Sequence, residues 1–325
     1  MTGTSFISES VRHAVELAAC APSIHNSQPW VFVVSEERID LYADRRRWLP
    51  TTDADQRDLM LSCGAALHHL RIGLAAAGVA ASVYRMPNAA KSDLVASIVL
   101  GEDGTDRVDA TLSDRIPLRR SDRRPFRSWP MPEAFQRQLT ERAAEQGALL
   151  RVINDPDARA VLVTAFAAAA AAQSGVPGYA QELQDWTDRP GAEGIPASNL
   201  ARPVSPTVEA ARDFGGQRVL PYNVEPEEAT LLVIGTSSDD QLSQLRAGEA
   251  MSAVLLEATR QGLGNCPLSQ PLEVGSTRET LQNDVLGGTL SPQVVLRIGW
   301  AQEDPLPPTP RRPVEEIIGE PPTGE

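Results

Sequence analysis

The sequence predicts an α+β fold in which two similar halves each combine an antiparallel-rich sheet with flanking helices. Stretches with helical apolar spacing alternate with short strand-like runs rich in Val, Ile and Leu along the 325 residues. The order of these elements nearly repeats, and each half contains a long helix of small residues that ends at a glycine. With 42% hydrophobic residues, the chain is long enough to bury two cores.

The first half begins with an apolar helical pattern that leads into a strand-like run, WVFVV. In order, we expect a helix at 8–20, strands at 30–34 and 39–43, a helix at 55–78, and strands at 83–86 and 94–101. The helix at 55–78 is apolar on nearly all sides, so it is expected to be buried, with Gly78 as its C′ residue.

The second half follows nearly the same order. We expect a helix at 132–146, a strand at 149–153, a helix at 157–173, a strand at 229–236, a helix at 241–262 and a strand at 294–300. The helix at 157–173 has no counterpart in the first half. We interpret the repeat as a diverged internal duplication, divided into 1–110 and 111–325, and the alternative is a chance similarity of two α+β halves.

The composition excludes several classes of partner. The net charge of −13 argues against nucleic acid and against an anionic membrane. The three cysteines are scattered without a CxxC pair or metal-ligand spacing, so we expect a reduced, cytoplasmic protein without a metal site. The first residues lack the pattern of a signal peptide, and the apolar run 160–172 is too short to span a bilayer.

The segment at about 174–228 interrupts the second half. It is rich in Gly and Pro and lacks long periodicity, which is typical of a functional lid or of disorder. Its large apolar side chains favour an ordered cover; they are Tyr179, Trp186, Ile195, Phe214 and Tyr222.

Two polar motifs are candidates for ligand binding. The loop APSIHNSQPW (21–30) places small polar side chains between a helix and a strand, where they serve either a turn or a ligand. The run RIPLRRSDRRPFR (115–127) holds six arginines in an acidic protein, and guanidinium groups suit bidentate binding of phosphate. The alternative for this run is a solvated basic face with Asp114 and Asp122 as partners.

A third motif, GLGNCPLSQP (262–271), follows the second long helix. Its glycines permit a sharp turn or close approach to a flat group, and the backbone N–H groups of Ser269 and Gln270 are free to meet a heteroaromatic nitrogen. The alternative is an ordinary glycine C-cap followed by a proline.

Together, APSxHNxQPW, RRSDRRPF, GEAxxxxxLEAxxxGLGNC and the terminal RRPVEEII resemble the FMN-dependent nitroreductase family. The motifs span residues 20–317, but their order differs, because the NxQPW motif lies in the first half and the RRSxR motif opens the second. This arrangement resembles the twin-domain, dormancy-associated nitroreductase-like proteins of mycobacteria, the Acg type. It implies two nitroreductase-type halves that mimic the family's homodimer and form one flavin site, so we expect a monomer.

The resemblance implies FMN as the cofactor and NAD(P)H as a candidate electron donor. FMN would carry the chemistry, so no catalytic side chain is expected. The residues implied in cofactor binding are Ser23, Asn26, Gln28, Arg119, Arg120, Ser121, Arg123, Pro267, Leu268, Ser269, Gln270 and Arg311. Trp30 is expected to pack the loop, His25 to make a loop hydrogen bond or to meet substrate, and His68 and His69 to be structural.

Three functions remain open from the sequence. The first is an NAD(P)H-dependent oxidoreductase that passes hydride through flavin N5 to a small nitroaromatic or quinone-type acceptor. The second is a catalytically weak protein that stores or sequesters FMN under the lid, where Trp186, Tyr179 and Phe214 would pack over the flavin ring. The third is a structural or sensor protein that kept the fold and lost the ligand.

Overall fold

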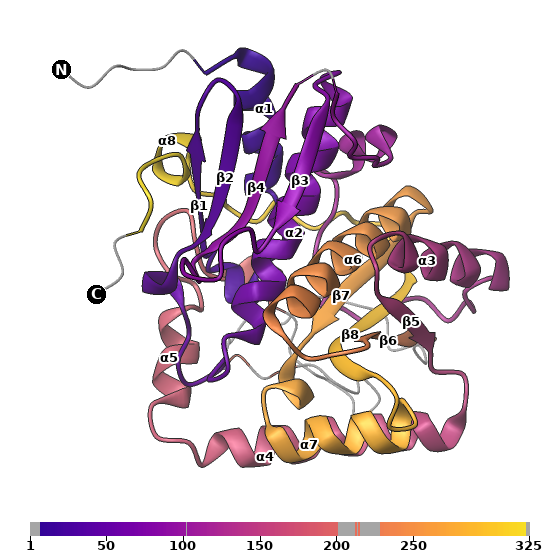
Figure 1. The fold of residues 1–325 in the computed structure, drawn as a ribbon. Helices are drawn as coiled ribbons and strands as arrows, with labels where there is room; N and C mark the ends of the chain where they lie inside the picture. The colour runs from indigo at the N-terminus through magenta and orange to yellow at the C-terminus, as the bar shows by residue number, and fades with distance from the viewer. Residues whose placement is uncertain (1–6, 102, 201–211, 213, 215–227, 323–325) are drawn as a thin grey trace.

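Two long helices that cross each other organise the structure, a computed structural model that describes residues 7–101, 103–200, 212, 214 and 228–322 (Figure 1). Helix α2 (Arg57–Ala76) packs against the first of two four-stranded sheets, helix α6 (Gln241–Arg260) packs against the second, and the two helices pack on each other. The predicted α+β class with sheets flanked by helices is confirmed.

The first half contains the predicted elements in the predicted order. They are α1 (Glu9–Ala19), β1 (Trp30–Val34), β2 (Arg38–Ala43), α2, β3 (Ala81–Arg85) and β4 (Leu94–Leu100). The sheet order is β1-β2-β4-β3, and every neighbouring pair is antiparallel. Apolar side chains of α1, α2 and the inward face of this sheet form part of the main core.

The second half repeats this topology. Its elements are α3 (Glu133–Glu145), β5 (Leu149–Val152), α4 (Pro156–Ser174), α5 (Tyr179–Asp185), β6 (Thr230–Thr236), α6, β7 (Leu263–Leu268), α7 (Gly275–Thr280) and β8 (Ser291–Trp300). The sheet order β5-β6-β8-β7 is the order of the first sheet when strands are counted within each half. The two-half architecture is therefore confirmed, while the boundary at 110/111 remains a prediction.

Strand β7 differs from the prediction, which treated residues 262–271 as a loop. The strand pairs antiparallel with β8 and forms the edge of its sheet. An edge strand tolerates the missing N–H of Pro267, and this explains why a segment with Gly and Pro still forms a strand. The short helices α5 and α7 were also absent from the prediction.

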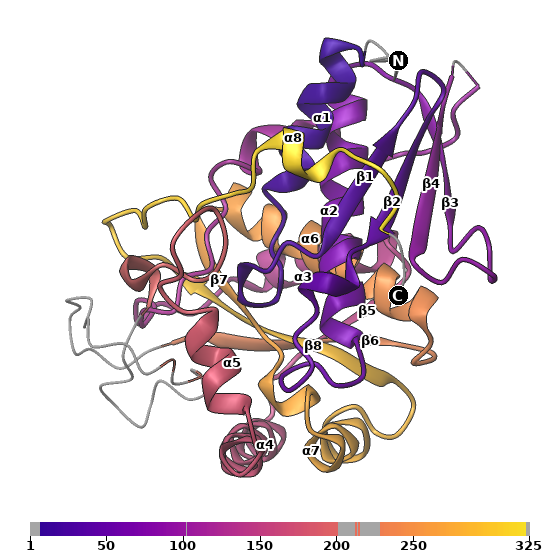
Figure 2. The same ribbon diagram turned by 90° about the vertical axis from the view of Figure 1, so that its left-hand side faces the viewer.

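The C-terminal tail returns to the first half. The last helix, α8 (Val314–Ile317), lies beside α1 and β1, as Figure 2 shows. Val314 and Ile317 are buried in the main core, and Ile318 forms a parallel bridge with Phe32. This path brings Arg311 next to the loop at 21–28.

The crossing of α2 and α6 depends on two glycines. A Cβ on Gly64 would collide with the carbonyl oxygen of Leu245 and lie 2.9 Å from the Cα of Gly248, and a Cβ on Gly248 would collide with the carbonyl oxygen of Leu61. The helices therefore touch backbone to backbone, and buried residues of both halves join in one core.

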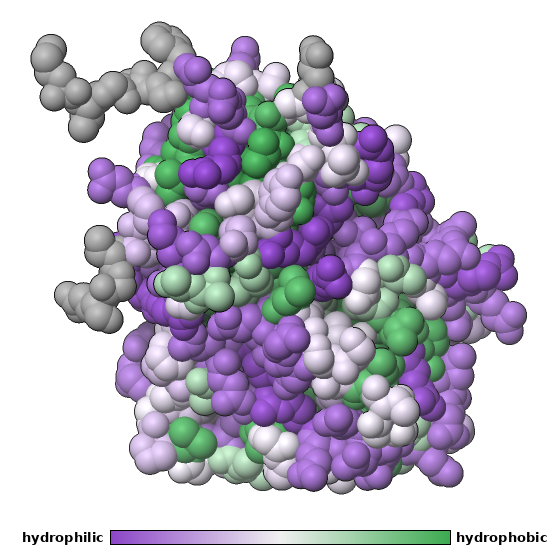
Figure 3. Space-filling model, in the orientation of Figure 1, coloured by the Kyte–Doolittle hydropathy of each residue, from purple (hydrophilic) through white to green (hydrophobic). Residues whose placement is uncertain are grey.

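Within the described residues, α2 has the length and hydropathy of a membrane-spanning helix, but most of its apolar window is buried inside the fold. Helices α4 and α5 would pass the same test only as one span bent by 100°. On the face drawn in Figure 3, hydrophobic residues form separate areas within a mostly hydrophilic surface.

The close crossing gives a testable prediction for stability. We expect Gly64→Ala to lower the free energy of unfolding by about 3 kcal/mol, because the added methyl group forces two helix backbones apart. Gly275→Ala is the matched control, since a Cβ there meets nothing within 4 Å. Urea unfolding measures both variants, and equal stability of the two would contradict the proposed role of the crossing.

Candidate functional site

A cavity lies where the two halves meet, beside the crossing of α2 and α6. The space between its walls is about 920 Å³, including open solvent at the mouth. The first half contributes Pro22, Ser23, Ile24, His25, Asp58, Leu61 and Ser62 to its wall. The second half contributes Ser121, Arg123, Phe166, Arg212, Phe214, Met251, Cys266, Pro267, Leu268, Ser269, Gln270, Val294 and Arg297.

The loop at 21–28 enters the cavity in an unusual backbone conformation. His25, Asn26 and Gln28 have positive φ angles of 45°, 56° and 50°, a region that costs a residue with a side chain roughly 1–2 kcal/mol. Hydrogen bonds hold this conformation, because Ser23 Oγ accepts from the N–H of Gln28 at 2.9 Å and Ser62 Oγ accepts from the N–H of Ile24 at 3.2 Å. Strain of this kind is typical of functional sites.

Asn26 and Gln28 are buried outside the cavity wall, and their amides bind other parts of the chain. Asn26 Nδ2 donates to the carbonyl of Gly194 at 2.9 Å, and its Oδ1 accepts from Arg311 at 2.7 Å. Gln28 Nε2 donates to the carbonyl of Ala192 at 2.8 Å, and its Oε1 accepts from the N–H of Arg312 at 2.9 Å. The two amides therefore connect the loop to the segment at about 174–228, called the cover segment below, and to the C-terminal tail.

The basic run 115–127 divides into structural and cavity-facing residues. Arg124 forms a bidentate ion pair with Asp122, with bonds of 3.0 and 2.7 Å. Asp122 is thus its partner, as the alternative predicted, but both side chains are buried and do not form a solvated face. Ser121 and Arg123 line the cavity, and Ser121 bridges Asn265 of β7. The guanidinium of Arg123 lies 5.2 Å from the ring centre of Phe214.

Three arginines form a cationic cluster next to this cavity wall, of which Arg119 is buried and Arg120 and Arg311 are half-buried. Within the described part of the chain, none of them forms an ion pair with a carboxylate, and Arg119 Nε and Nη1, Arg120 Nε and Arg311 Nε have no hydrogen-bond partner. Burial and the neighbouring cations lower the pKa of Arg119 to about 9. Burial likewise lowers the pKa of Arg311 to about 10.

The end of β7 supplies backbone donors to the cavity. The N–H groups of Ser269 and Gln270 donate to no acceptor among the described residues, as the sequence predicted. The flat group that Gly264 approaches is the aromatic ring of Phe126, a part of the protein itself. A Cβ on Gly264 would lie only 2.6 Å from this ring. The ring of Phe126 in turn stacks against the guanidinium of Arg297, at 4.2 Å.

The cover segment reaches the cavity through Arg212 and Phe214. Phe214 packs edge-on against His25, with ring centres 5.5 Å apart, and Arg212 pairs with buried Glu273. Tyr179 and Trp186 do not line the cavity. Tyr179 accepts a hydrogen bond from Arg212 at 2.9 Å, and Trp186 lies between Arg47 and Arg189. Tyr222 lies outside the described residues.

His68 and His69 have structural roles, as the sequence suggested, whereas the loop hydrogen bond expected for His25 is not found at its Nδ1. His68 bonds Ser252 across the helix crossing at 2.9 Å, and His69 bonds the carbonyl of Leu17 at 3.2 Å, so both have structural contacts. His25 faces the cavity, and its Nδ1 has no partner among the described residues. Burial and the nearby Arg212 and Arg123 hold the pKa of His25 well below its ordinary value, so its ring is neutral.

The structure brings seven of the twelve predicted cofactor residues together in the cavity wall: Ser23, Ser121, Arg123, Pro267, Leu268, Ser269 and Gln270. The other five are Asn26, Gln28, Arg119, Arg120 and Arg311, and they lie behind it. Sequence reasoning gave no role to Asp58, Phe166 or Arg212. Their position in the wall depends on contacts between distant parts of the chain, and no local pattern marks it.

Comparison with known proteins places the chain among relatives of the same length. It is 40% identical over 317 residues to "Putative NAD(P)H nitroreductase Rv3131" of Mycobacterium tuberculosis, covering 95% of this chain and 91% of the relative. It is 36% identical over 327 residues to "Putative NAD(P)H nitroreductase acg" of the same organism, covering 98% of each chain. No protein-family model matches the chain.

Among solved structures, the FMN-dependent nitroreductase NfnB from Mycobacterium smegmatis in complex with NADPH is 18% identical, covers 65% of this chain and 98% of that chain, and has a TM-score of 0.43. The identity to the two M. tuberculosis proteins extends over nearly the whole of each chain. The chain therefore belongs to the mycobacterial NAD(P)H nitroreductase-like family that includes Acg.

Proposed function

We propose that this protein binds FMN in the cavity between its halves and acts as an NAD(P)H-dependent oxidoreductase of the nitroreductase type. The observation that carries the proposal is the cluster of Arg119, Arg120 and Arg311, which have buried guanidinium nitrogens without a hydrogen-bond partner and no anionic partner among the described residues. Family membership supports the same function, since two relatives are named as NAD(P)H nitroreductases.

The cluster fits a phosphate group. Buried cations are normally paired, and an unpaired buried guanidinium costs free energy that an incoming anion restores. Phosphate offers oxygens that match the guanidinium donors. Asn26 accepts a hydrogen bond from Arg311 and holds it in the cluster, so we assign Asn26 a positioning role.

The cavity wall fits the remainder of FMN. Ser121 and Arg123 follow directly after Arg119 and Arg120 in the sequence and line the cavity. They would hold the polar side of the cofactor. The free N–H groups of Ser269 and Gln270 would donate to a flavin ring nitrogen or oxygen. Met251, Phe166 and Ile24 supply apolar surface for a planar ring.

When bound, FMN supplies hydride transfer between NAD(P)H and a small nitroaromatic or quinone-type acceptor. The protein orients both partners, excludes water from the cavity and stabilises negative charge through Arg123 and the cluster. No nucleic acid or membrane takes part in this reaction. The two halves already form the interface that carries the site, so we propose that the chain works as a monomer.

The cover supports a second candidate, a flavin protein with slow turnover. Phe214 and Arg212 line the cavity from the cover segment, and Asn26 and Gln28 bind the cover backbone at Gly194 and Ala192. A closed cover would keep nicotinamide away from the flavin. Bound FMN would then be stored, and the protein would turn over only when the cover opens.

The first test is the absorbance spectrum of the purified protein with FMN, recorded anaerobically before and after NADPH is added. We expect a bound-flavin spectrum that bleaches with NADPH, followed by recovery when a nitroaromatic acceptor is added. A bound flavin that only dithionite reduces would favour storage. A protein that does not bind FMN at all would overturn both candidates.

Arg119→Met tests the cluster. In the ligand-free protein, we expect this change to raise the free energy of unfolding by about 2 kcal/mol, because it removes an unpaired buried charge. The same change should weaken FMN binding at least tenfold. Arg137→Met, an exposed position on α3, is the control and should alter neither quantity. Urea unfolding in phosphate-free buffer and fluorescence titration measure the two effects.

The same variant has a pH signature. Because burial lowers the pKa of Arg119 to about 9 in the folded protein, well below its ordinary value in the unfolded chain, the unfolded chain binds the proton more tightly. The ligand-free protein should therefore gain stability as the pH rises above about 9. We expect a smaller gain in Arg119→Met over pH 8–10.5, and an identical gain would contradict the burial of an unpaired charge.

Phe214→Ala tests the cover. If the cover limits access, the rate of flavin bleaching by NADPH should increase about tenfold or more, since the open form would be a minor state in the unmodified protein. Trp129→Ala, an exposed aromatic residue outside the cavity, is the control. An unchanged rate in Phe214→Ala would show that the cover does not limit reduction.

A further inference from the structure

Three acidic side chains gather at the start of α2, and structural contacts explain two of them. Asp53 accepts hydrogen bonds from the N–H groups of Asp58 and Leu59 at 3.0 and 2.9 Å, so it caps the helix. Glu273 pairs with Arg212 and accepts a hydrogen bond from Ser269 at 2.7 Å. The third acidic residue is Asp58, which is 8% exposed.

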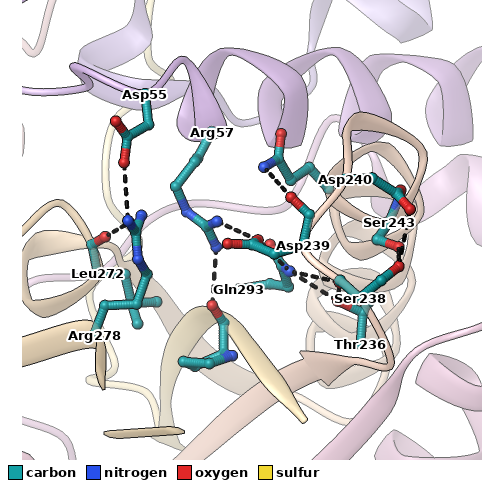
Figure 4. A network of polar contacts seen from close by, with 12 residues as sticks. Asp55, Arg57, Thr236, Ser238, Asp239, Asp240, Ser243, Leu272, Arg278 and Gln293 are labelled. Atoms are coloured by element: carbon teal, nitrogen blue, oxygen red, sulfur yellow. Dashed lines mark hydrogen bonds and ion pairs between the residues drawn. The ribbon is translucent and has the colours of Figure 1, made fainter. Parts of the chain in front are cut away.

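The Asp58 carboxyl group faces the cavity and forms no hydrogen bond or ion pair with any described residue. It also borders a second, smaller hollow on its other side, whose wall includes Arg57, Arg278 and Gln293. Figure 4 shows these side chains reaching between the first half and the C-terminal part, with Asp55 bonded to Arg278 at 2.9 Å. Asp55 is exposed, so this hollow lies close to the surface.

The surroundings of Asp58 favour the protonated acid. Burial is the largest influence, and the charges of Asp53 and Glu273 act in the same direction, so the pKa of Asp58 lies well above its ordinary value. Arg57 and Arg212 oppose this shift, as does the N-terminal end of α2. Both arginines are already paired, Arg57 with Asp239 and Arg212 with Glu273.

Two further cations line the same cavity, Arg123 and Arg297. Arg297 donates to the backbone carbonyl of Arg124 at 2.8 Å and stacks on Phe126, and Arg123 lies over Phe214. His25 is the other titratable side chain that the first half contributes to the cavity wall, and its ring is neutral.

We propose that Asp58 is the proton donor to the electron acceptor in this cavity, a role that rests on the proposed oxidoreductase function. Reduction of a nitro group to a nitroso group consumes one hydride and one proton and releases water. The hydride from NAD(P)H, carried by the flavin, provides the electron pair. The O–H bond of Asp58 breaks as its proton joins the departing oxygen of the nitro group.

The same balance holds for a quinone, which takes one hydride and one proton to become a hydroquinone. In both cases Asp58 is left as a carboxylate and regains its proton from water through the second hollow. The proposal thus assigns the acceptor a chemical class, a molecule whose oxygen must be protonated as electrons arrive. General acid catalysis of this kind contributes about 10²–10⁴-fold to rate.

The first experiment uses the protein without FMN, so it does not depend on the proposed function. The infrared carbonyl band of a protonated carboxylic acid is recorded at pH 8.5, where Asp53, with a pKa raised to about 7 by burial, is mostly ionised. We expect the band in the unmodified protein and in Asp284→Asn, an exposed position, and its loss in Asp58→Asn. A band that persists in Asp58→Asn would overturn the proposal.

The second experiment separates proton delivery from electron transfer. In the FMN-loaded protein, reduced first with NADPH, Asp58→Asn should slow reoxidation by a nitroaromatic or by menadione about 100-fold or more. Reoxidation by ferricyanide, which takes electrons without protons, should stay within about twofold. Asp284→Asn is the control for both acceptors, since its side chain is exposed and lies outside the cavity and the second hollow.

The outcomes distinguish the two proposals. Equal slowing with both acceptors, or no slowing, would overturn the role of Asp58 while leaving the oxidoreductase function intact. Failure of NADPH to reduce the flavin in the unmodified protein would remove the proposed function, and the infrared band would still report whether Asp58 is protonated. If Asp58→Asn unfolds at lower urea concentration, Asp58→Glu keeps the acid and should restore nitroaromatic reduction in part; no recovery in a folded Asp58→Glu protein would count against proton donation.

Discussion

The backbone contact between Gly64 and Gly248 is the constraint on which the rest of the structure depends. Because neither helix has a side chain at the crossing, α2 and α6 approach closely enough for one core to span both halves. The cavity lies beside this crossing, with Leu61 and Met251 in its wall. A wider helix separation would part the loop at 21–28 from the end of β7, and the site requires both.

The site combines two unfavourable kinds of burial at its two ends. On one side, the buried Arg119 and the half-buried Arg311 lack carboxylate partners among the described residues, and on the other, Asp58 is a buried acid without a hydrogen-bond partner there. Each lowers the stability of the ligand-free fold, and each is a group that a phosphate-bearing redox cofactor and its acceptor would use. Such a pattern is typical of sites selected for function over stability.

Much of the fold could be predicted, because strands such as β1 and β6 are short apolar runs and α2 and α6 are long, periodic and ended by glycines with positive φ, Gly78 and Gly262. Strand β7 could not, since Gly and Pro conceal an edge strand. In the site, the RRSDR motif led to Ser121 and Arg123, which line the cavity although their neighbours in sequence do not. Asp58 and Arg212 gave no local signal, because only the packing of distant segments brings them to the cavity.

The amides of Asn26 and Gln28 link the ligand loop to the cover, and this sets how often the cavity can open. Their bonds to Gly194 and Ala192, together with two bonds from the backbone of Thr51 and Thr52 to Glu182, hold the described part of the cover in place. At about 1 kcal/mol for each bond, these four bonds would favour the closed form by about 4 kcal/mol, and the ion pairs of Arg47 with Glu193 and of Arg212 with Glu273 would add to this. The open form would then make up roughly one molecule in a thousand or fewer. An oxidoreductase with this cover would be slow unless a partner or substrate breaks those contacts, so the balance between turnover and storage depends on the cover and not on the flavin site itself.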